Sequence, residues 1–276
     1  MPTVLKQRIL TAVPLALIVL ALIWRAPVVW IQIVMAAAML VAAWEWADLS
    51  GYQRRSSRIA YVGVMAVLLA VMATTELADQ TLWRVPGLLW WLGVGVWLLY
   101  QARRPMPAHL PGWLRGGAGL VTLTLAWASV ASIHGQPGVG PFWLTVLVIL
   151  VWGSDIGGYF AGRRYGRHKL APSISPGKTW EGVAGGLALA IALVVALRAI
   201  ADGYYTDLPG YSWLIAVGIM VALLSVVGDL SESVLKRQAG RKDSGRLLPG
   251  HGGMLDRIDA LLAAAPVLAA ALVSGP

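Results

Sequence analysis

The sequence predicts an all-α polytopic membrane protein with about nine transmembrane helices and a cytoplasmic N-terminus. Three observations favour this fold class. Hydrophobic residues make up 58% of the 276 residues, and charged residues only 13%. Apolar runs that are long enough to cross about 30 Å of hydrocarbon recur along the whole chain. Lysine and arginine gather in every second connection between these runs, as the positive-inside rule expects.

The first predicted span follows Lys6 and Arg8 and contains Pro14, which is expected to kink it. A charged start and an apolar run are also typical of a signal peptide. No small-residue cleavage site follows, so we interpret this run as a retained helix. In the fourth span Pro86 lies near the start, where proline is tolerated, and the last span is short and rich in alanine. The predicted spans are about 9–24, 27–47, 59–75, 85–100, 116–134, 141–161, 180–200, 211–230 and 258–274.

The distribution of basic residues supports nine spans. Only Arg25, Arg84 and Arg198 fall on one side of the membrane, and the other 19 of the 22 lysine and arginine residues fall on the opposite side. The positive-inside rule places the basic side, with the N-terminus, in the cytoplasm. Tryptophan near many predicted span ends matches the aromatic belts of membrane proteins.

Composition also predicts the organisation of the chain and excludes some functions. Residues 1–140 have few intramembrane charges, with Glu45 the main exception, and are expected to form a scaffold of membrane helices. Residues 141–276 are expected to form a catalytic membrane region. The absence of cysteine excludes disulfides, thiolate catalysis and cysteine-ligated metals. The net charge of +9 orients membrane helices, so no nucleic-acid partner is expected.

A polar segment, residues 228–259, holds five carboxylates and six lysine or arginine residues in this apolar chain. Asp229, Glu232, Ser233 and Lys236 have the spacing i, i+3, i+4 and i+7, which places them on one face of a helix. A solvated helix end with internal ion pairs is the alternative interpretation. Since Asp229 directly follows an apolar run, we favour a functional face at the cytoplasmic end of the eighth span.

Asp256 and Asp259 share a face at the start of the ninth span. Acidic residues at a helix N-terminus also stabilise the helix dipole, so simple capping is the alternative. Asp229 and Asp256 lie at the cytoplasmic ends of consecutive antiparallel helices, where both can bind one hard cation. Carboxylate oxygens favour Mg²⁺, which commonly binds one or two carboxylates together with substrate phosphates.

Two loops contain candidate phosphate-binding groups. Backbone N–H groups of Gly252 and Gly253 can approach phosphate oxygens closely, although a plain turn is the alternative. Asp155 lies in an apolar helix and is a functional candidate for that reason. Lys178 could contact a phosphate or anchor the membrane surface. Its Gly-Lys-Thr context is not a P-loop, because Pro172 stands where the leading glycine should be.

These residues together indicate a site for phosphate groups and a hard divalent metal at the cytoplasmic membrane surface. Phosphoryl or nucleotidyl transfer needs a metal and cations that neutralise charge and position the reacting groups.

The polar segment resembles the signature of a known family. The matching pattern is Ser233-x-Leu235-Lys236-Arg237-x4-Lys242-Asp243-x-Gly245-x2-Leu248-Pro249-x-His251-Gly252-Gly253-Met254-x-Asp256-Arg257-Ile258-Asp259. It resembles that of the phosphatidate cytidylyltransferase (CDP-diglyceride synthase) family. Residues 155–160 and 174–182 resemble two upstream blocks of the family, so the similarity covers about residues 150–260. Gly177 stands where the family often has a second basic residue.

The resemblance implies a reaction of phospholipid biosynthesis, in which CTP and phosphatidic acid give CDP-diacylglycerol and pyrophosphate. It implies Mg²⁺ and a second, monovalent cation such as K⁺. The implied metal ligands are Asp229, Asp256 and Asp259. The implied catalytic residues are Asp229, Ser233, Lys236, Asp243 and Asp256. The implied substrate-binding residues are Asp155, Lys178, Glu181, Arg237, Lys242, His251, Gly252, Gly253 and Arg257.

Two other functions stay open at this stage. One is CTP-dependent transfer to another lipid phosphate or to a polyprenol. The other is an ion-coupled transporter that uses Asp155 and Glu45 as an ion path. For the favoured function we expect a multi-pass protein of the inner (plasma) membrane, with its active site on the cytoplasmic side and a homodimer as its assembly.

Overall fold

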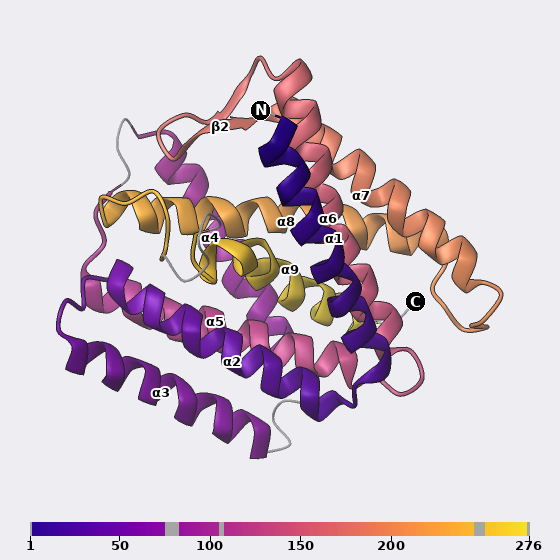
Figure 1. Cartoon of the computed structure of the whole chain (residues 1–276), viewed down its shortest axis with the longest axis horizontal. Helices are drawn as coiled ribbons and strands as arrows, with labels where there is room; N and C mark the ends of the chain where they lie inside the picture. Colours follow the sequence, from indigo (N-terminus) through magenta and orange to yellow (C-terminus); the bar gives the residue numbers. More distant parts are fainter. Residues whose placement is uncertain (1, 75–82, 105–107, 246–251, 275–276) are drawn as a thin grey trace.

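The computed structural model describes residues 2–74, 83–104, 108–245 and 252–274. These residues form nine α-helices and one β-hairpin (Figure 1). The helices are α1 (Pro2–Arg25), α2 (Val28–Leu49), α3 (Arg55–Thr74), α4 (Arg84–Ala102), α5 (Gly112–His134), α6 (Gly140–Tyr165), α7 (Trp180–Ala201), α8 (Tyr211–Gln238) and α9 (Leu255–Ser274). Strands β1 (Lys169–Ala171) and β2 (Ser175–Thr179) pair antiparallel between α6 and α7.

The predicted all-α membrane fold is confirmed. Seven helices of the described chain, α2 to α8, are long and apolar enough to cross a membrane, and α1 contributes a shorter apolar stretch, Pro14–Arg25. Each predicted span coincides with one helix. Many large apolar side chains face outward from these helices, as contact with lipid requires, including Leu17, Val67, Val96 and Leu99.

Helix α9 lies at the centre of the bundle. It packs against α2, α4, α5, α6 and α8. Its residues from Leu262 to Ala271 are buried on every side, because neighbouring helices surround it. Alanine dominates this stretch, and small side chains let adjacent helices approach closely in a membrane. The core therefore joins both halves of the chain, and the expected division at residue 140 into scaffold and catalytic region stays a prediction.

Helices α6 and α7 approach each other through glycine. A Cβ atom at Gly157 would lie 2.9 Å from the Cα of Gly186, and one at Gly186 would lie 2.5 Å from the carbonyl oxygen of Ser154. Neither position has room for a side chain. This packing brings the start of α7 beside the end of α6, where the β-hairpin connects them.

Four connections gather at one end of the bundle, which we call the polar end: those between α2 and α3, α4 and α5, α6 and α7, and α8 and α9. Gln238 Nε2 donates to the carbonyl oxygen of Ala108 at 2.7 Å, Arg237 Nε donates to that of Ile174 at 3.4 Å, and Arg241 pairs with Asp48. In Figure 1 the α2–α3 connection and the end of α8 lie at the left of the view. This arrangement is the alternation that nine spans predict.

Helix α8 continues about two turns beyond the end of the predicted membrane span, through the polar face that was expected to be helical. Hydropathy marks where apolar residues stop, whereas leucine, glutamate, lysine and arginine continue a helix readily. The polar residues from Asp229 to Lys236 are therefore all helical. The β-hairpin was not predicted, because its two strands are short and contain proline and glycine.

Candidate active site

The polar face of α8 has the register that its spacing predicts. Ser233 Oγ lies 3.5 Å from Asp229 Oδ1, and Lys236 Nζ lies 2.5 Å from Glu232 Oε2. The Glu232 side chain is only 2% exposed. These contacts join residues four positions apart, as neighbouring turns of a helix require. The alternative of a solvated helix end does not fit Glu232, which is buried, and Lys236 is only partly exposed.

Lys236 connects α8 to the start of α9. Its ammonium lies 2.7 Å from Asp256 Oδ1. The other oxygen, Asp256 Oδ2, accepts hydrogen bonds from Gly253 N at 2.8 Å, Ser244 N at 3.0 Å and Ser244 Oγ at 3.0 Å. Asp256 therefore organises the loop before α9 and faces Lys236. It does not cap α9 itself.

The glycine pair supports Asp256. Gly252 has φ +81°, a left-handed conformation that favours glycine, and its absent Cβ would lie 2.6 Å from Asp256 Oδ2. The N–H of Gly253 is used by Asp256, so the structure does not direct it to a phosphate as predicted. The physical reason is that a nearby carboxylate accepts this hydrogen bond first. His251 lies outside the described residues.

Lys178, at the end of the β-hairpin, pairs with Asp229 of α8. The Lys178 Nζ to Asp229 Oδ2 distance is 2.6 Å. The next residue, Thr179, caps α7, because its Oγ1 accepts a hydrogen bond from Gly182 N at 3.1 Å. This cap fixes where the hairpin ends, and so fixes the position of Lys178 over α8. The Lys178 ammonium is therefore held at a carboxylate of α8, and its contact with a phosphate stays a prediction.

A cavity of about 320 Å³ lies between α6, α7 and α8 beside this ion pair. Asp155, Lys178 and Asp229 line it together, as the sequence predicted. Part of its wall is glycine from α6 and α7, which leaves room for a ligand. We call this space the α6–α8 cavity. Its lining residues also include Tyr159, Leu187, Leu223 and Val226.

Two predicted substrate-binding residues support the hairpin instead. Glu181 accepts hydrogen bonds from the backbone N–H groups of Arg167 at 3.1 Å and His168 at 3.2 Å, and lies 2.6 Å from His168 Nδ1. Arg237 donates to the hairpin carbonyl of Ile174. The structure thus places both residues against the protein backbone rather than in a described cavity.

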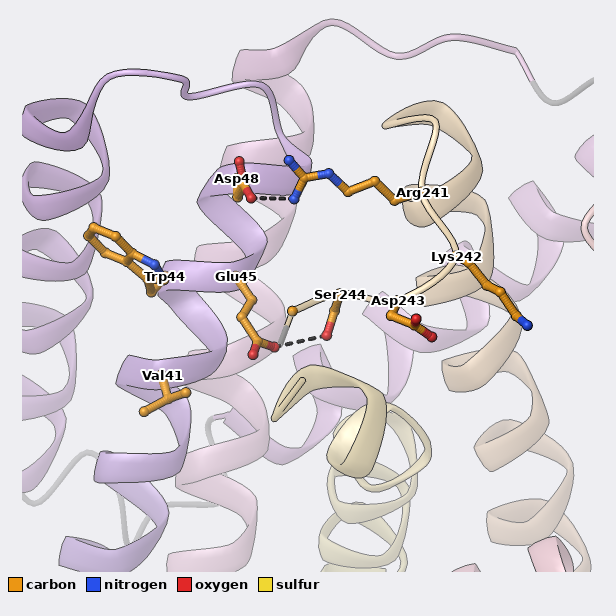
Figure 2. A pocket seen from close by; sticks show the side chains of 9 residues that line it. Val41, Trp44, Glu45, Asp48, Arg241, Lys242, Asp243 and Ser244 are labelled. Carbon is orange, nitrogen blue, oxygen red and sulfur yellow. Dashed lines mark hydrogen bonds and ion pairs between the residues drawn. The ribbon is translucent and has the colours of Figure 1, made fainter. Parts of the chain in front are cut away.

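Lys242 and Asp243 lie in a second cavity, of about 580 Å³, between α2 and the α8–α9 loop (Figure 2). We call it the α2 cavity. Both side chains are exposed. The structure therefore divides the predicted site residues between two spaces. Asp256 contacts Ser244 in the lining of the α2 cavity, whereas Asp229 lines the α6–α8 cavity.

Five carboxylates and three cations form one electrostatically connected group across α6 to α9. The members are Asp155, Asp229, Glu232, Asp256, Asp259, Lys178, Lys236 and Arg257. With all of them ionised, the group has a formal charge of −2. Asp259 lies close to α8, because Gly228 lets the two helices touch at the Asp259 carbonyl.

The donor set fits a hard divalent cation. Oxygen ligands and an excess of negative charge favour Mg²⁺. One buried oxygen, Glu232 Oε1, has no hydrogen-bond partner within the described residues, and a cation would satisfy it. As the described side chains stand, no three acidic or histidine residues are placed to chelate one ion, because lysines pair with Asp229 and Asp256.

Sequence reasoning did not connect two buried residues with the site, although it singled out Glu45 as an intramembrane charge and as an ion path of a transporter. Glu45 extends from α2, and Ser244 lies in the α8–α9 loop. A lone carboxylate in an apolar helix is a signal in itself, and it marks Glu45 as unusual. Nothing in the spacing connects Glu45 to residues about 200 positions away. Ser244 has no distinguishing signal in the sequence.

Comparisons with known proteins agree with the expected family. The model of the cytidylyltransferase family matches residues 6–274. The chain is 42% identical over 273 residues to a phosphatidate cytidylyltransferase of Pseudomonas aeruginosa, with 97% of each chain covered. It is 33% identical to that of Haemophilus influenzae, over 95% of this chain and 96% of the relative. It is 38% identical to that of Brucella suis, over 96% of this chain and 92% of the relative.

Proposed function

Since the chain belongs to the cytidylyltransferase family, we propose that it transfers a cytidylyl group from CTP to phosphatidic acid, giving CDP-diacylglycerol and pyrophosphate. The similarity to phosphatidate cytidylyltransferases over nearly the whole chain carries this proposal. The cluster of carboxylates and cations at the polar end supports it, because the reaction joins two phosphate-bearing substrates. The chain is an enzyme of phospholipid biosynthesis.

The reaction needs little covalent chemistry from the protein. A lipid phosphate oxygen attacks the α-phosphorus of CTP, the new P–O bond forms, and the bond to the β-phosphate oxygen breaks to release pyrophosphate. The attacking phosphate is already ionised at neutral pH, so no strong general base is required. The main tasks of the site are positioning and charge neutralisation. Lys178, Lys236 and Arg257 are the cations placed to hold phosphate oxygens.

A metal ion would supply the remaining positive charge. Asp229, Asp256 and Asp259 would hold Mg²⁺, with the unpaired Oε1 of Glu232 as a further oxygen nearby. Bound Mg²⁺ neutralises phosphate charge and orients phosphate groups. Lys178 and Lys236 would then be available to phosphate oxygens. A second, monovalent cation such as K⁺ belongs to the same proposal, and a homodimer stays a prediction.

The α6–α8 cavity is the proposed site for the lipid phosphate. Two of its lining residues, Tyr159 and Leu223, are 57% and 44% exposed on the apolar outer surface of the bundle. In a membrane this surface faces lipid. A phosphatidate head group could reach Lys178 and Asp229 from that side while its acyl chains stay in the bilayer.

Incorporation of labelled CTP into a chloroform-soluble product tests the proposed function. Purified protein in mixed micelles should form this product only with phosphatidic acid present, and EDTA should abolish its formation until Mg²⁺ is restored. A panel of other lipid phosphates and polyprenols should give little product. Absence of Mg²⁺-dependent incorporation would contradict the proposal, and ion flux in liposomes without CTP would favour a transporter instead.

The polar end is proposed to face the cytoplasm at the inner membrane. The basic residues gathered there support this orientation. The chain has no cysteine, so the labelling of a single introduced cysteine shows on which side of the membrane that position lies. In right-side-out vesicles, a membrane-impermeant maleimide should label Gly203→Cys, in the α7–α8 turn, at once. It should label Lys169→Cys, in β1, only after permeabilisation. The reverse pattern would invert the topology.

A further inference from the structure

A carboxylate from the N-terminal half of the chain holds the start of α9. Glu45 extends from α2 and is only 5% exposed. Its Oε1 accepts a hydrogen bond from Met254 N at 3.0 Å, and its Oε2 accepts one from Leu255 N at 2.9 Å. These N–H groups begin α9 and have no partner inside the helix. Glu45 is therefore the cap of α9, supplied by a helix about 210 residues earlier in the sequence.

The position of Glu45 is energetically demanding. A carboxylate inside a membrane protein costs a few kcal/mol unless other groups compensate it. Here the compensation comes from hydrogen bonds and from the positive end of the α9 dipole. All of the donors belong to the α8–α9 loop and the first turn of α9. The buried charge thus acts on the loop before α9 and on the first turn of α9, which carries Asp256.

Two glycines of the loop are shaped around this carboxylate. A Cβ atom at Gly245 would overlap the Glu45 carboxyl group, and one at Gly253 would overlap both Glu45 and Ser244. Only glycine at these two positions lets the carboxyl group enter the loop. The need for glycine at both positions follows from Glu45, which the sequence pattern of the loop does not reveal.

Ser244 connects Glu45 to Asp256. Its hydroxyl oxygen lies 2.9 Å from Glu45 Oε2 and 3.0 Å from Asp256 Oδ2, and the side chain is 1% exposed. Figure 2 shows the hydrogen bond between Glu45 and Ser244. The single hydroxyl proton can be donated to one carboxylate at a time, while Ser244 N donates to Asp256. The three residues form a continuous chain from α2 to α9.

We propose that Glu45 is a positioning residue for cytidylyl transfer, which orients Asp256 through Ser244 and through the first turn of α9. This inference rests on the proposed function, and Glu45 itself is not expected to touch substrate. Residues that orient a metal ligand or a reacting group typically contribute about 10- to 100-fold to activity. The N-terminal half therefore contributes to the site as well as to the scaffold.

Asp48 offers a matched control. It lies one turn after Glu45 on α2 and lines the same cavity (Figure 2). Its carboxylate pairs with Arg58 and Arg241 rather than with the start of α9. Replacement of Asp48 by asparagine removes a carboxylate from the same helix and cavity without touching the chain from Glu45 to Asp256.

The kinetic experiment compares Glu45→Gln with Asp48→Asn in the CTP incorporation assay. Glu45→Gln should lower kcat about 10- to 100-fold with little change in KM for CTP, because positioning is lost rather than binding. Asp48→Asn should keep kcat near that of the unaltered protein. An unchanged kcat in Glu45→Gln, or an equal loss in Asp48→Asn, would overturn the proposal.

A second variant keeps the test decisive if Glu45→Gln folds poorly. Ser244→Ala cuts the chain between the two carboxylates but leaves the α9 cap in place, and it should also lower kcat. The double variant should lose little more than the worse single variant, because both changes break one chain. Independent losses that add fully would contradict coupling through Ser244.

Hydrogen exchange separates this inference from the proposed function. In the full-length protein in detergent, the amides of Met254 and Leu255 should exchange slowly. Their exchange should be faster in Glu45→Gln, and Asp48→Asn should leave its rate unchanged. This readout needs no activity. If the unaltered protein does not use CTP, the proposed function fails while the exchange result still judges the cap. If exchange is identical in Glu45→Gln, the positioning role fails although the reaction stands.

Discussion

Replacing Asp229 or Asp256 by asparagine is expected to lower the rate of CTP incorporation by about 10²–10³-fold, the range for one group that stabilises transition-state charge. Each substitution removes a proposed oxygen ligand of Mg²⁺ and leaves a lysine without its partner. Asp229 pairs with Lys178 at 2.6 Å, and Asp256 pairs with Lys236 at 2.7 Å. Initial rates at several Mg²⁺ concentrations measure the loss and any shift in the metal requirement.

The control for these variants is Asp207→Asn. Asp207 is an exposed carboxylate in the α7–α8 connection, at the end opposite to the polar end, and it accepts a hydrogen bond from the hydroxyl of the neighbouring Thr206 at 3.1 Å. This variant should keep full activity, which excludes a general effect of removing a negative charge. All variants should insert into the membrane in normal amounts. Retained activity in both Asp229→Asn and Asp256→Asn would refute a shared metal site.

Lys236→Met is expected to cause the largest loss of stability, on the order of 3–5 kcal/mol, the range for breaking a buried ion pair. The ammonium is 14% exposed and lies between the carboxylates of Glu232 and Asp256. Without it, two carboxylates are left together away from water. Thermal unfolding of the purified protein in detergent measures this loss.

A double variant separates the structural role of Lys236 from its role in the reaction. Lys236→Met with Glu232→Gln removes one buried charge of each sign, so most of the lost stability should return. Activity should stay low, because the cation proposed to hold a phosphate is still missing. Lys169→Met, which removes an exposed lysine of β1, is the control and should change neither property. A double variant with normal activity would exclude Lys236 from the site.

Much of the fold and part of the site could be predicted from local patterns. A transmembrane helix is recognisable because about 20 apolar residues must be consecutive to cross the bilayer. The α8 face was predictable because residues four apart on a helix must be neighbours. The predicted membrane span ends at residue 230, whereas the helix continues through the predicted polar face to Gln238. The β-hairpin was missed, because five residues around proline and glycine give no strand pattern.

The carboxylate contacts could not be predicted in the same way. The sequence suggested Asp229 and Asp256 as partners around one ion, and the structure pairs each with a different lysine. Lys236 reaches Asp256 because α8 and α9 pack against each other, with a close approach at Gly228. Lys178 reaches Asp229 because the β-hairpin between α6 and α7 ends beside α8, and neither contact is visible before these elements are packed.

The sequence by itself therefore determined the all-α membrane fold class, the nine helices and the family, because each depends on composition or on spacing within one segment. The tertiary structure alone decided that Lys242 and Asp243 line a different cavity from Asp229, and that Glu45 caps α9. Helix packing brings residues hundreds of positions apart to hydrogen-bond distance, and no local period records that contact. The chemical character of the polar segment follows from its own residues, but the contact of Glu45 in α2 with the start of α9 exists only in the packed bundle.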